Sequence, residues 1–343
     1  MSDVEIRILG RAGRITLNRP KALNALTYEM CLAIENAFDS WRDDATVDLV
    51  VIDAAGDRGF CAGGDIAELY AQGIKGNYSY GQKFWADEYR LNHKIYTYAK
   101  PVVSFLQGFT MGGGVGIGCH GSRRVVGESS QIAMPECGIG LVPDVGGSMI
   151  LARAPGRLGE YLGITATRMG PADAIFAGFA DIYVPERMWT PLTREMEETG
   201  SADGLVVAAQ TPPEGWLEGQ IEQITALFTG EDLRDIVTKL GNDGSDFAMA
   251  ALKNIRRNSP LSAACTVEMI HRLRGPALTM EKALDLEYRF THRACEHGDF
   301  LEGIRAAIID KDRAPKWQYP SGEVPYAAVT KMLQPLGAQA LKL

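Results

Sequence analysis

The sequence lacks the residue patterns that build disulfide frameworks and zinc sites. Its six cysteines are scattered along 343 residues without a single C-x-x-C pair, whereas such sites need closely spaced cysteines. The five histidines are equally dispersed, and none stands in an H-E-x-x-H pattern, the helical zinc motif. We therefore expect no disulfide framework and no bound metal.

Long apolar segments and an excess of basic charge are also missing. No apolar run approaches the ~20 residues that span a bilayer, and the start, MSDVEIRIL, carries acids where a signal peptide needs basic and apolar residues. The formal charge is -8, from 35 basic and 43 acidic residues, which disfavours wide contact with nucleic acid or an anionic membrane. These features predict a soluble, cytoplasmic protein with a small-molecule partner. The final LKL is similar to the peroxisomal S-K-L signal, but leucine replaces its small first residue.

The first half of the chain alternates apolar strands with helical segments. VEIRIL, GRITLN, DLVVID, KPVVSFLQG and SRRVVGE are typical of strands, and the nearly continuous apolar run of DLVVID suits a sheet covered on both faces. A helix is predicted to begin after the N-cap Thr27, with one apolar face made of Met30, Ile34, Phe38 and Trp41. This alternation predicts an α/β fold.

The pattern changes in the second half. After ADIYVP, near residue 185, strands fade, and TPPEGW at 211–216 indicates a turn or linker. The chain beyond is mostly helical, and a stretch from Thr279 places Met280, Leu284 and Tyr288 in register. We predict a catalytic core over residues 1–199 and a mostly helical region over 200–343, whose tail after Trp317 runs as coil before a last short helix.

Two acids stand in an apolar stretch, MPECGIGLVPDVGG at 134–147, where Glu136 and Asp144 are the only charges. A carboxylate in apolar surroundings must find hydrogen bonds or lose several kcal/mol, on the order of the desolvation of an ion. One interpretation is structural, with Glu136 beginning a turn after Pro135 and Asp144 capping the helix of GGSMILARA. The other is that both acids perform chemistry.

Two glycine-rich turns follow predicted strands, RGFCAGGDI at 58–66 and FTMGGGVGIG at 109–118. Glycine lets backbone N–H groups approach a ligand closely, so the turns could supply two donors to a developing oxyanion. Tight packing of a helix on the sheet is the alternative. A literal G-x-G-x-x-G runs from Gly116 to Gly121, but a strand follows it where a dinucleotide fingerprint requires a helix.

NRPKALNALT, FCAGGDI, TMGGGVGIG, MPECGIGLVPDVGG and GIRAAIIDKDRAPKW together resemble the crotonase superfamily of acyl-CoA enzymes, from the first strands to about Trp317. The resemblance implies a spiral of ββα units followed by a helical region. It also implies an acyl-CoA substrate and no separate cofactor, because coenzyme A is part of the substrate. Members often form trimers or pairs of trimers, so a homo-oligomer is an expectation, although no interface can be read from this sequence.

The resemblance also implies roles for individual residues. The oxyanion donors would be the N–H groups of Gly64 and Gly113, and Glu88 would contact the substrate. The segment along which coenzyme A lies, with its neighbours, would comprise Lys21, Ala22, Leu23, Ala62, Asp65 and Ile66.

One departure separates this chain from the hydratases of the superfamily. They use two glutamates to deliver water to a double bond; the second matches Glu136, but the first position is Gly116, which cannot carry a proton. Glu136 and Asp144 instead resemble the pair of the superfamily's hydrolases. This implies hydrolysis of a short β-hydroxyacyl-CoA, most specifically 3-hydroxyisobutyryl-CoA of valine catabolism, with Glu136 as nucleophile or base and Asp144 orienting the hydroxyl or the water. Hydration or isomerisation on the same scaffold and non-catalytic acyl-CoA binding are the alternatives.

Overall fold

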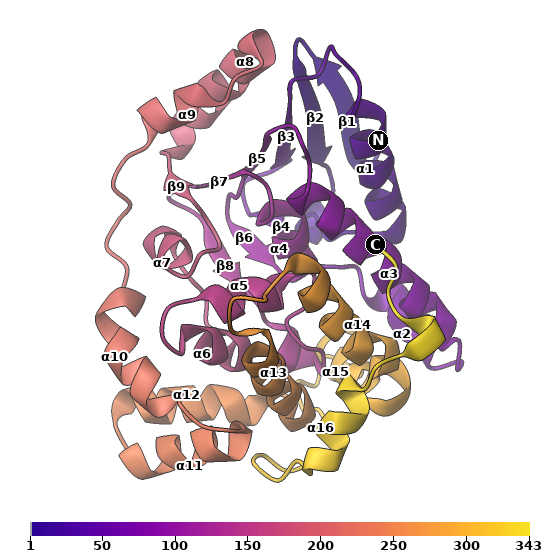
Figure 1. The fold of residues 1–343 in the computed structure, drawn as a ribbon, viewed down its shortest axis with the longest axis vertical. Helices are drawn as coiled ribbons and strands as arrows, with labels where there is room; N and C mark the ends of the chain where they lie inside the picture. The colour runs from indigo at the N-terminus through magenta and orange to yellow at the C-terminus, as the bar shows by residue number, and fades with distance from the viewer. Residues whose placement is uncertain (1) are drawn as a thin grey trace. The chain divides into compact units, whose positions relative to one another are not determined.

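In the computed structural model, which describes residues 2–343, the strands form two sheets (Figure 1). The larger has the order β1-β2-β3-β5-β7-β9 and the smaller β4-β6-β8. Their bounds are β1 Val4–Leu9, β2 Ala12–Leu17, β3 Leu49–Ala54, β4 Gly59–Cys61, β5 Val102–Phe105, β6 Phe109–Met111, β7 Arg123–Val126, β8 Gln131–Ala133 and β9 Ile182–Tyr183. The five strands predicted before residue 130 are thereby confirmed.

The sheets are predominantly parallel. β1 and β2 form an antiparallel hairpin, whereas all other strand pairs run parallel. Parallel strands need long crossover connections, which helices usually provide. The α/β class is confirmed.

Two compact units can be distinguished, and each is assembled from three separate segments. The first comprises the residues up to Gly64, Arg90–Ala133 and Arg168–Glu218; the second comprises Asp65–Tyr89, Met134–Thr167 and Gly219–Leu343. All the strands belong to the first unit. These units alternate along the chain, whereas the division into 1–199 and 200–343 describes consecutive regions. The assignment of the catalytic core to residues 1–199 stays a prediction.

The first unit covers its large sheet with helices on both faces. Because successive strand residues point to opposite faces, Ala12 and Gly13 of β2 report on the two sides. Ala12 belongs to a core completed by α8 (Trp189–Thr199) and α9 (Asp203–Ala208). A side chain at Gly13 would lie 2.5 Å from the ring of Trp41, the last residue of α1 (Tyr28–Trp41).

Helix α1 forms as predicted. The Thr27 hydroxyl accepts a hydrogen bond from the N–H of Met30 at 3.2 Å, and the predicted apolar face is buried: Met30, Ile34, Phe38 and Trp41. The other helices of the first unit are α4 (Gly113–Gly118) and α7 (Pro171–Phe176).

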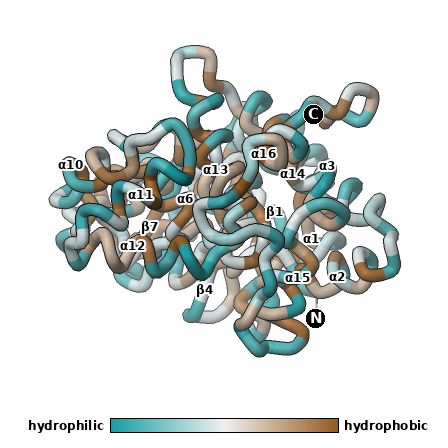
Figure 2. The backbone as a smooth tube through the Cα atoms, turned by 90° about the horizontal axis from the view of Figure 1, so that it is seen from below, coloured by the Kyte–Doolittle hydropathy of each residue, from teal (hydrophilic) through white to brown (hydrophobic). Residues whose placement is uncertain are grey.

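The second unit is helical. It contains α2 (Ala67–Gly73), α5 (Gly147–Arg153), α6 (Leu158–Thr165), α11 (Leu233–Asp243), α12 (Asp246–Arg257), α13 (Pro260–Leu273), α14 (Met280–His297), α15 (Phe300–Ile304) and α16 (Tyr326–Leu333). α3 (Tyr78–Tyr96) and α10 (Leu217–Leu227) include residues of both units. Hydrophobic and hydrophilic residues alternate along α11 and α12 (Figure 2), as expected for helices with one buried face.

The helical predictions for this half of the chain are confirmed at α14 and α16. The Thr279 hydroxyl caps α14 by accepting the N–H of Lys282 at 3.3 Å, and Met280, Leu284 and Tyr288 are buried. α16 is the short helix expected after the coil. Within residues 2–343, no helix combines the length and the apolar character needed to cross a membrane.

Candidate active site

Four carboxyl side chains are buried in the second unit: Glu88, Glu136, Asp144 and Glu287. Each is less than 5% exposed. They come from α3, from the short 3-10 helix η2 (Glu136–Ile139), from the turn before α5, and from α14. Within the described part of the chain no basic side chain pairs with them, and burial is the first cause that raises the pKa of each.

Glu136 is the first residue of η2, directly after Pro135. Its Oε2 atom is buried and has no hydrogen-bond partner among residues 2–343. Burial, and then the nearby Asp144 carboxylate, hold its pKa well above the ordinary value. The acid does begin a helical turn, as the structural interpretation expects, but that role leaves one oxygen unpaired. An unpaired buried oxygen at a position where a substrate is expected points to chemistry.

Asp144 is bonded by a tyrosine. The Tyr89 hydroxyl donates to Asp144 Oδ2 at 2.7 Å, and Thr291 Oγ1 lies 3.4 Å from the same hydroxyl. Burial raises the pKa of Asp144 to about 7, while the bond from Tyr89 lowers it. The bond from Tyr89 favours the ionised form of Asp144, and the Asp144 carboxylate in turn raises the pKa of Glu136.

The prediction of Asp144 as a helix cap is wrong. α5 begins after Gly146, which is its N-cap residue, and the N–H groups of this helix start bond to Glu287. Glu287 Oε2 accepts from Gly146 N–H at 2.8 Å, and Oε1 accepts from the N–H of Ser148 at 3.1 Å and from its hydroxyl. Glu287 thereby fixes the turn that carries Asp144.

That turn has an uncommon backbone. Val145 adopts φ +53° and Gly146 φ +80°, and a left-handed conformation is unfavourable for a β-branched residue such as valine. The hydrogen bonds to Glu287 offset this unfavourable conformation. Burial raises the pKa of Glu287 to about 8, with a further contribution from Asp144.

The two glycine turns lie together in the first unit. β4 and β6 pair in parallel, so their carboxyl ends meet, and each is followed by a glycine with positive φ, Gly63 (+114°) and Gly112 (+52°). A side chain on Gly63 would lie 4.0 Å from the nitrogen of Gly113. Within residues 2–343, no backbone carbonyl accepts a hydrogen bond from Gly64 N–H or Gly113 N–H, so both donors can serve a ligand.

Close packing explains other glycines of these turns. A side chain on Gly114 would lie 2.3 Å from the carbonyl oxygen of Cys61, and one on Gly118 would lie 2.6 Å from Leu106. The packing interpretation therefore holds for α4 itself. The rejection of the G-x-G-x-x-G as a dinucleotide fingerprint is confirmed, because α4 ends at Gly118 and the strand β7 follows from Arg123, so no helix begins within residues 116–121.

The segment assigned to coenzyme A meets the first glycine turn. Lys21 and Ala22 are exposed in the 3-10 helix η1 (Pro20–Ala22), and the carbonyl of Leu23 accepts the N–H of Ala62 at 3.0 Å. Asn24, which the sequence interpretation missed, fixes this contact: its Nδ2 donates to Gly59 O at 2.9 Å. Asp65 and Ile66 begin the second unit, just before α2, and are partly exposed.

The chain matches the family model described as enoyl-CoA hydratase/isomerase over residues 12–333. It belongs to this family. Similar curated proteins are named 3-hydroxyisobutyryl-CoA hydrolase, mitochondrial: that of Danio rerio is 40% identical over 92% of this chain and 85% of its own length, and that of Gallus gallus is 36% identical over 100% and 91%.

Solved structures of family members carry other names. An enoyl-CoA hydratase from Rhodobacter sphaeroides 2.4.1 is 55% identical with a TM-score of 0.96, and each chain covers 100% of the other. A carnitinyl-CoA dehydratase from Mycobacterium thermoresistibile is 39% identical with a TM-score of 0.93 over 98% of this chain and 97% of its own. These likenesses confirm the crotonase-type fold.

The sequence interpretation missed two residues at the carboxyl cluster, Tyr89 and Glu287. A signal for Glu287 existed, because it stands three residues after Leu284 and one before Tyr288, on the face of α14 predicted to be buried. Tyr89 directly follows Glu88, and nothing local in the sequence distinguishes it. The functional roles assigned to the cluster and to the glycine turns stay predictions.

Proposed function

We propose that the protein hydrolyses 3-hydroxyisobutyryl-CoA, a β-hydroxyacyl thioester of valine catabolism, to 3-hydroxyisobutyrate and coenzyme A. The observation that carries the proposal is the buried pair of Glu136 and Asp144, which has no basic partner among the described residues. Relatives at 36–40% identity over most of the chain, named as hydrolases of this substrate, support it.

In the proposed reaction, the thioester carbonyl oxygen accepts hydrogen bonds from Gly64 N–H and Gly113 N–H, which stabilise the negative charge that develops on it. Ionised Glu136 either attacks the carbonyl carbon, giving a mixed anhydride that water cleaves, or removes a proton from the attacking water. The C–S bond breaks and coenzyme A leaves as the thiolate, which takes up a proton. Asp144, oriented by Tyr89, accepts a hydrogen bond from the substrate hydroxyl or from the water.

Hydration of an enoyl-CoA is the second candidate, since the R. sphaeroides structure bears the name of a hydratase. Against it stands Gly116, which is buried in α4 and, by the resemblance, occupies the position where the superfamily's hydratases have their first glutamate. Glycine can hold no proton for transfer. Isomerisation needs only a single carboxylate, so Gly116 does not argue against it.

A panel of coenzyme A thioesters separates these candidates. We expect free thiol to appear with 3-hydroxyisobutyryl-CoA faster than with isobutyryl-CoA, and no loss of the conjugated double bond of an enoyl-CoA. Loss of that bond without thiol release would favour the hydratase, and movement of the bond would favour the isomerase. Binding without any conversion would indicate a non-catalytic acyl-CoA protein.

We also propose the cofactor requirement, the oligomeric state and the cellular location of the protein. The two carboxyls and two N–H donors account for hydrolysis without a separate cofactor, which dialysis against chelator followed by the thiol assay tests. Assembly into a homo-oligomer can be measured by light scattering. A cytoplasmic location stays a prediction, which cell fractionation can test. The vertebrate relatives are named as mitochondrial.

A further inference from the structure

Among residues 2–343, no other side chain holds the Glu136 carboxyl. Its Oε2 atom has no hydrogen-bond partner in that range, and the carboxyl takes a hydrogen bond from the backbone N–H of Glu136 itself. Asp144 differs, because the Tyr89 hydroxyl bonds to its Oδ2 atom at 2.7 Å. The Glu287 carboxyl likewise bonds to the turn before α5. The place of the Glu136 carboxyl therefore depends on the backbone of η2.

The backbone of η2 is held at its second residue, Cys137. The carbonyl oxygen of Cys137 accepts the N–H of Ser259 at 2.9 Å. The Cys137 thiol is buried, donates to the carbonyl of Gly163 at 3.4 Å and lies 3.4 Å from Thr266 Oγ1. Because Cys137 directly follows Glu136, these bonds fix the peptide that carries the acid.

Ser259 connects η2 to a buried carboxyl. It is the N-cap residue of α13, and its hydroxyl accepts the N–H of Ser262 at 3.1 Å. The same hydroxyl donates to Asp299 Oδ2 at 2.6 Å, and Asp299 Oδ1 accepts the N–H of Gln318 at 3.0 Å. Ser259 is 0% and Asp299 2% exposed, so solvent does not compete for these bonds. A continuous series of hydrogen bonds thus joins Cys137, Ser259 and Asp299.

The other end of η2 packs on the backbone around Asp299. A side chain on Gly140, which follows η2 with φ +76°, would lie 2.5 Å from the carbonyl carbon of Asp299. A side chain on Gly303 of α15 would lie 2.1 Å from the carbonyl oxygen of Ile139. Contacts this close are possible only for glycine. Asp299 therefore acts on both ends of η2, through Ser259 at the first and through its own backbone at the second.

Helix capping explains only part of the hydrogen bonding of Ser259. A serine at an N-cap accepts an N–H from the first turn of its helix, and Ser259 does so at α13. Ser245 has the same function at α12, where its hydroxyl accepts the N–H of Ala248 at 3.2 Å. Capping requires neither the bond from Ser259 N–H to η2 nor the bond to Asp299. These two bonds need another explanation.

We propose, on the basis of the function proposed above for Glu136, that Ser259 and Asp299 are positioning residues that place Glu136 by fixing the backbone of η2. Neither residue touches the reacting atoms. A displacement of a reacting group by about 1 Å can cost on the order of 100-fold in rate. A small shift of η2 is therefore enough to slow the reaction while the coenzyme A portion of the substrate still binds.

Steady-state kinetics of Ser259→Ala and Asp299→Ala test the proposal, with the thioester that the wild type converts fastest. We expect kcat to fall about tenfold or more in each variant, while KM changes less than about twofold. Asp299→Asn keeps a carbonyl oxygen that can accept from the Ser259 hydroxyl, so it should recover most of the kcat lost in Asp299→Ala. If Ser259→Ala does not fold, Ser259→Gly takes its place, because glycine at an N-cap costs less stability than alanine.

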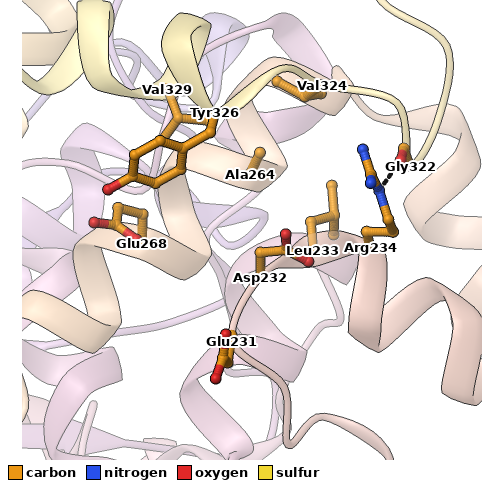
Figure 3. A pocket seen from close by; sticks show the side chains of 10 residues that line it. All are labelled: Glu231, Asp232, Leu233, Arg234, Ala264, Glu268, Gly322, Val324, Tyr326 and Val329. Atoms are coloured by element: carbon orange, nitrogen blue, oxygen red, sulfur yellow. Dashed lines mark hydrogen bonds between the residues drawn. The ribbon is translucent and has the colours of Figure 1, made fainter.

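Two controls separate positioning from helix stability. Ser245→Ala removes the same kind of cap bond from α12 and should lower the melting temperature about as much as Ser259→Ala, with kcat unchanged. Glu268→Ala changes α13 itself on the side away from η2, because Glu268 lies about 200° around the helix from Thr266. Glu268 lines a separate cavity of about 330 Å³ together with Tyr326 (Figure 3). The kcat of this variant should also stay unchanged.

Crystal structures of the variants supply a readout that does not depend on activity. The Cα atom of Glu136 should shift, or its carboxyl become disordered, in Ser259→Ala and stay in place in Ser245→Ala. The proposal is overturned if Glu136 keeps its position in both Ser259→Ala and Asp299→Ala, or if both variants keep kcat within about twofold of the wild type. An equal loss of kcat in Ser245→Ala and Ser259→Ala would also overturn it. A wild type that converts no thioester would contradict the proposed function alone, because the displacement of Glu136 would still decide whether Ser259 and Asp299 position it.

Discussion

Replacement of Glu287 by glutamine should change how the stability of the protein depends on pH. Glu287 is fully buried and accepts hydrogen bonds from Gly146 and from Ser148. In the folded chain its pKa is raised to about 8, from 4.5 for the same carboxyl in water. Between those two values the folded state binds a proton that the unfolded state has lost, so stability present at low pH is lost as the pH rises.

The size of the effect follows from this proton. The free energy of unfolding of the wild type should fall through Glu287 by up to about 1.4 kcal/mol per pH unit between pH 4.5 and 8. Glutamine does not titrate, so Glu287→Gln removes this contribution to the slope. Its amide nitrogen cannot accept a hydrogen bond, which costs about 1 to 3 kcal/mol at every pH. We therefore expect the variant to be the less stable protein at pH 5 and the two stability curves to converge or cross by pH 8.

Urea unfolding at pH 5, 6, 7 and 8 measures both curves. Glu296→Gln is the matched control, because it makes the same change at an exposed position of the same helix, and its curve should run parallel to that of the wild type. If the curve of Glu287→Gln also runs parallel, then Glu287 is not the buried, proton-binding group described here. As a second readout, kcat should fall in Glu287→Gln while KM stays nearly unchanged, since the turn carrying Asp144 loses a hydrogen bond.

The remaining predictions concern the reaction. Glu136→Gln keeps the size of the side chain and should lower turnover at least ~100-fold with little change in substrate binding; near-normal turnover in a folded variant would remove Glu136 from the mechanism. The kcat/KM of the wild type should rise with pH, because Glu136 must lose a proton that burial and Asp144 retain, and Asp144→Asn should move this rise to lower pH; an unmoved profile would contradict the coupling. Asp144→Gly should slow hydroxyacyl hydrolysis more than plain acyl hydrolysis and so narrow the ratio of kcat/KM between 3-hydroxyisobutyryl-CoA and isobutyryl-CoA; a constant ratio would limit Asp144 to placing water. Coenzyme A thioesters should raise the melting temperature, whereas NAD and NADP should not; the opposite result would contradict acyl-CoA binding.

Local patterns allowed much of the fold to be predicted. Thr27 and Thr279 are found as N-caps, and the apolar faces that follow them are buried, because capping and periodicity act within a few residues of the chain. The short strands β4, β6 and β8 were not predicted. Each has three residues, too few for a period of two to show.

The candidate site was predicted only where its residues share one stretch of sequence. Glu136 and Asp144 stand out together because an apolar segment surrounds both. Glu287 could not be assigned to them, since 141 residues separate it from Gly146 and no periodic pattern reports a contact over that distance. The interleaving of the two compact units escaped prediction for the same reason.

The bonds between Glu287 and the turn before α5 also determine when this turn can form during synthesis. Because 141 residues separate Glu287 from Gly146, a ribosome adding about 5 to 20 residues per second reaches Glu287 roughly 7 to 28 s after Gly146. All strands of both sheets precede α14 in the chain, so they can pair earlier. The growing chain therefore carries Asp144 on a turn that lacks its bonds until α14 arrives, and catalytic competence would be acquired among the last steps of production.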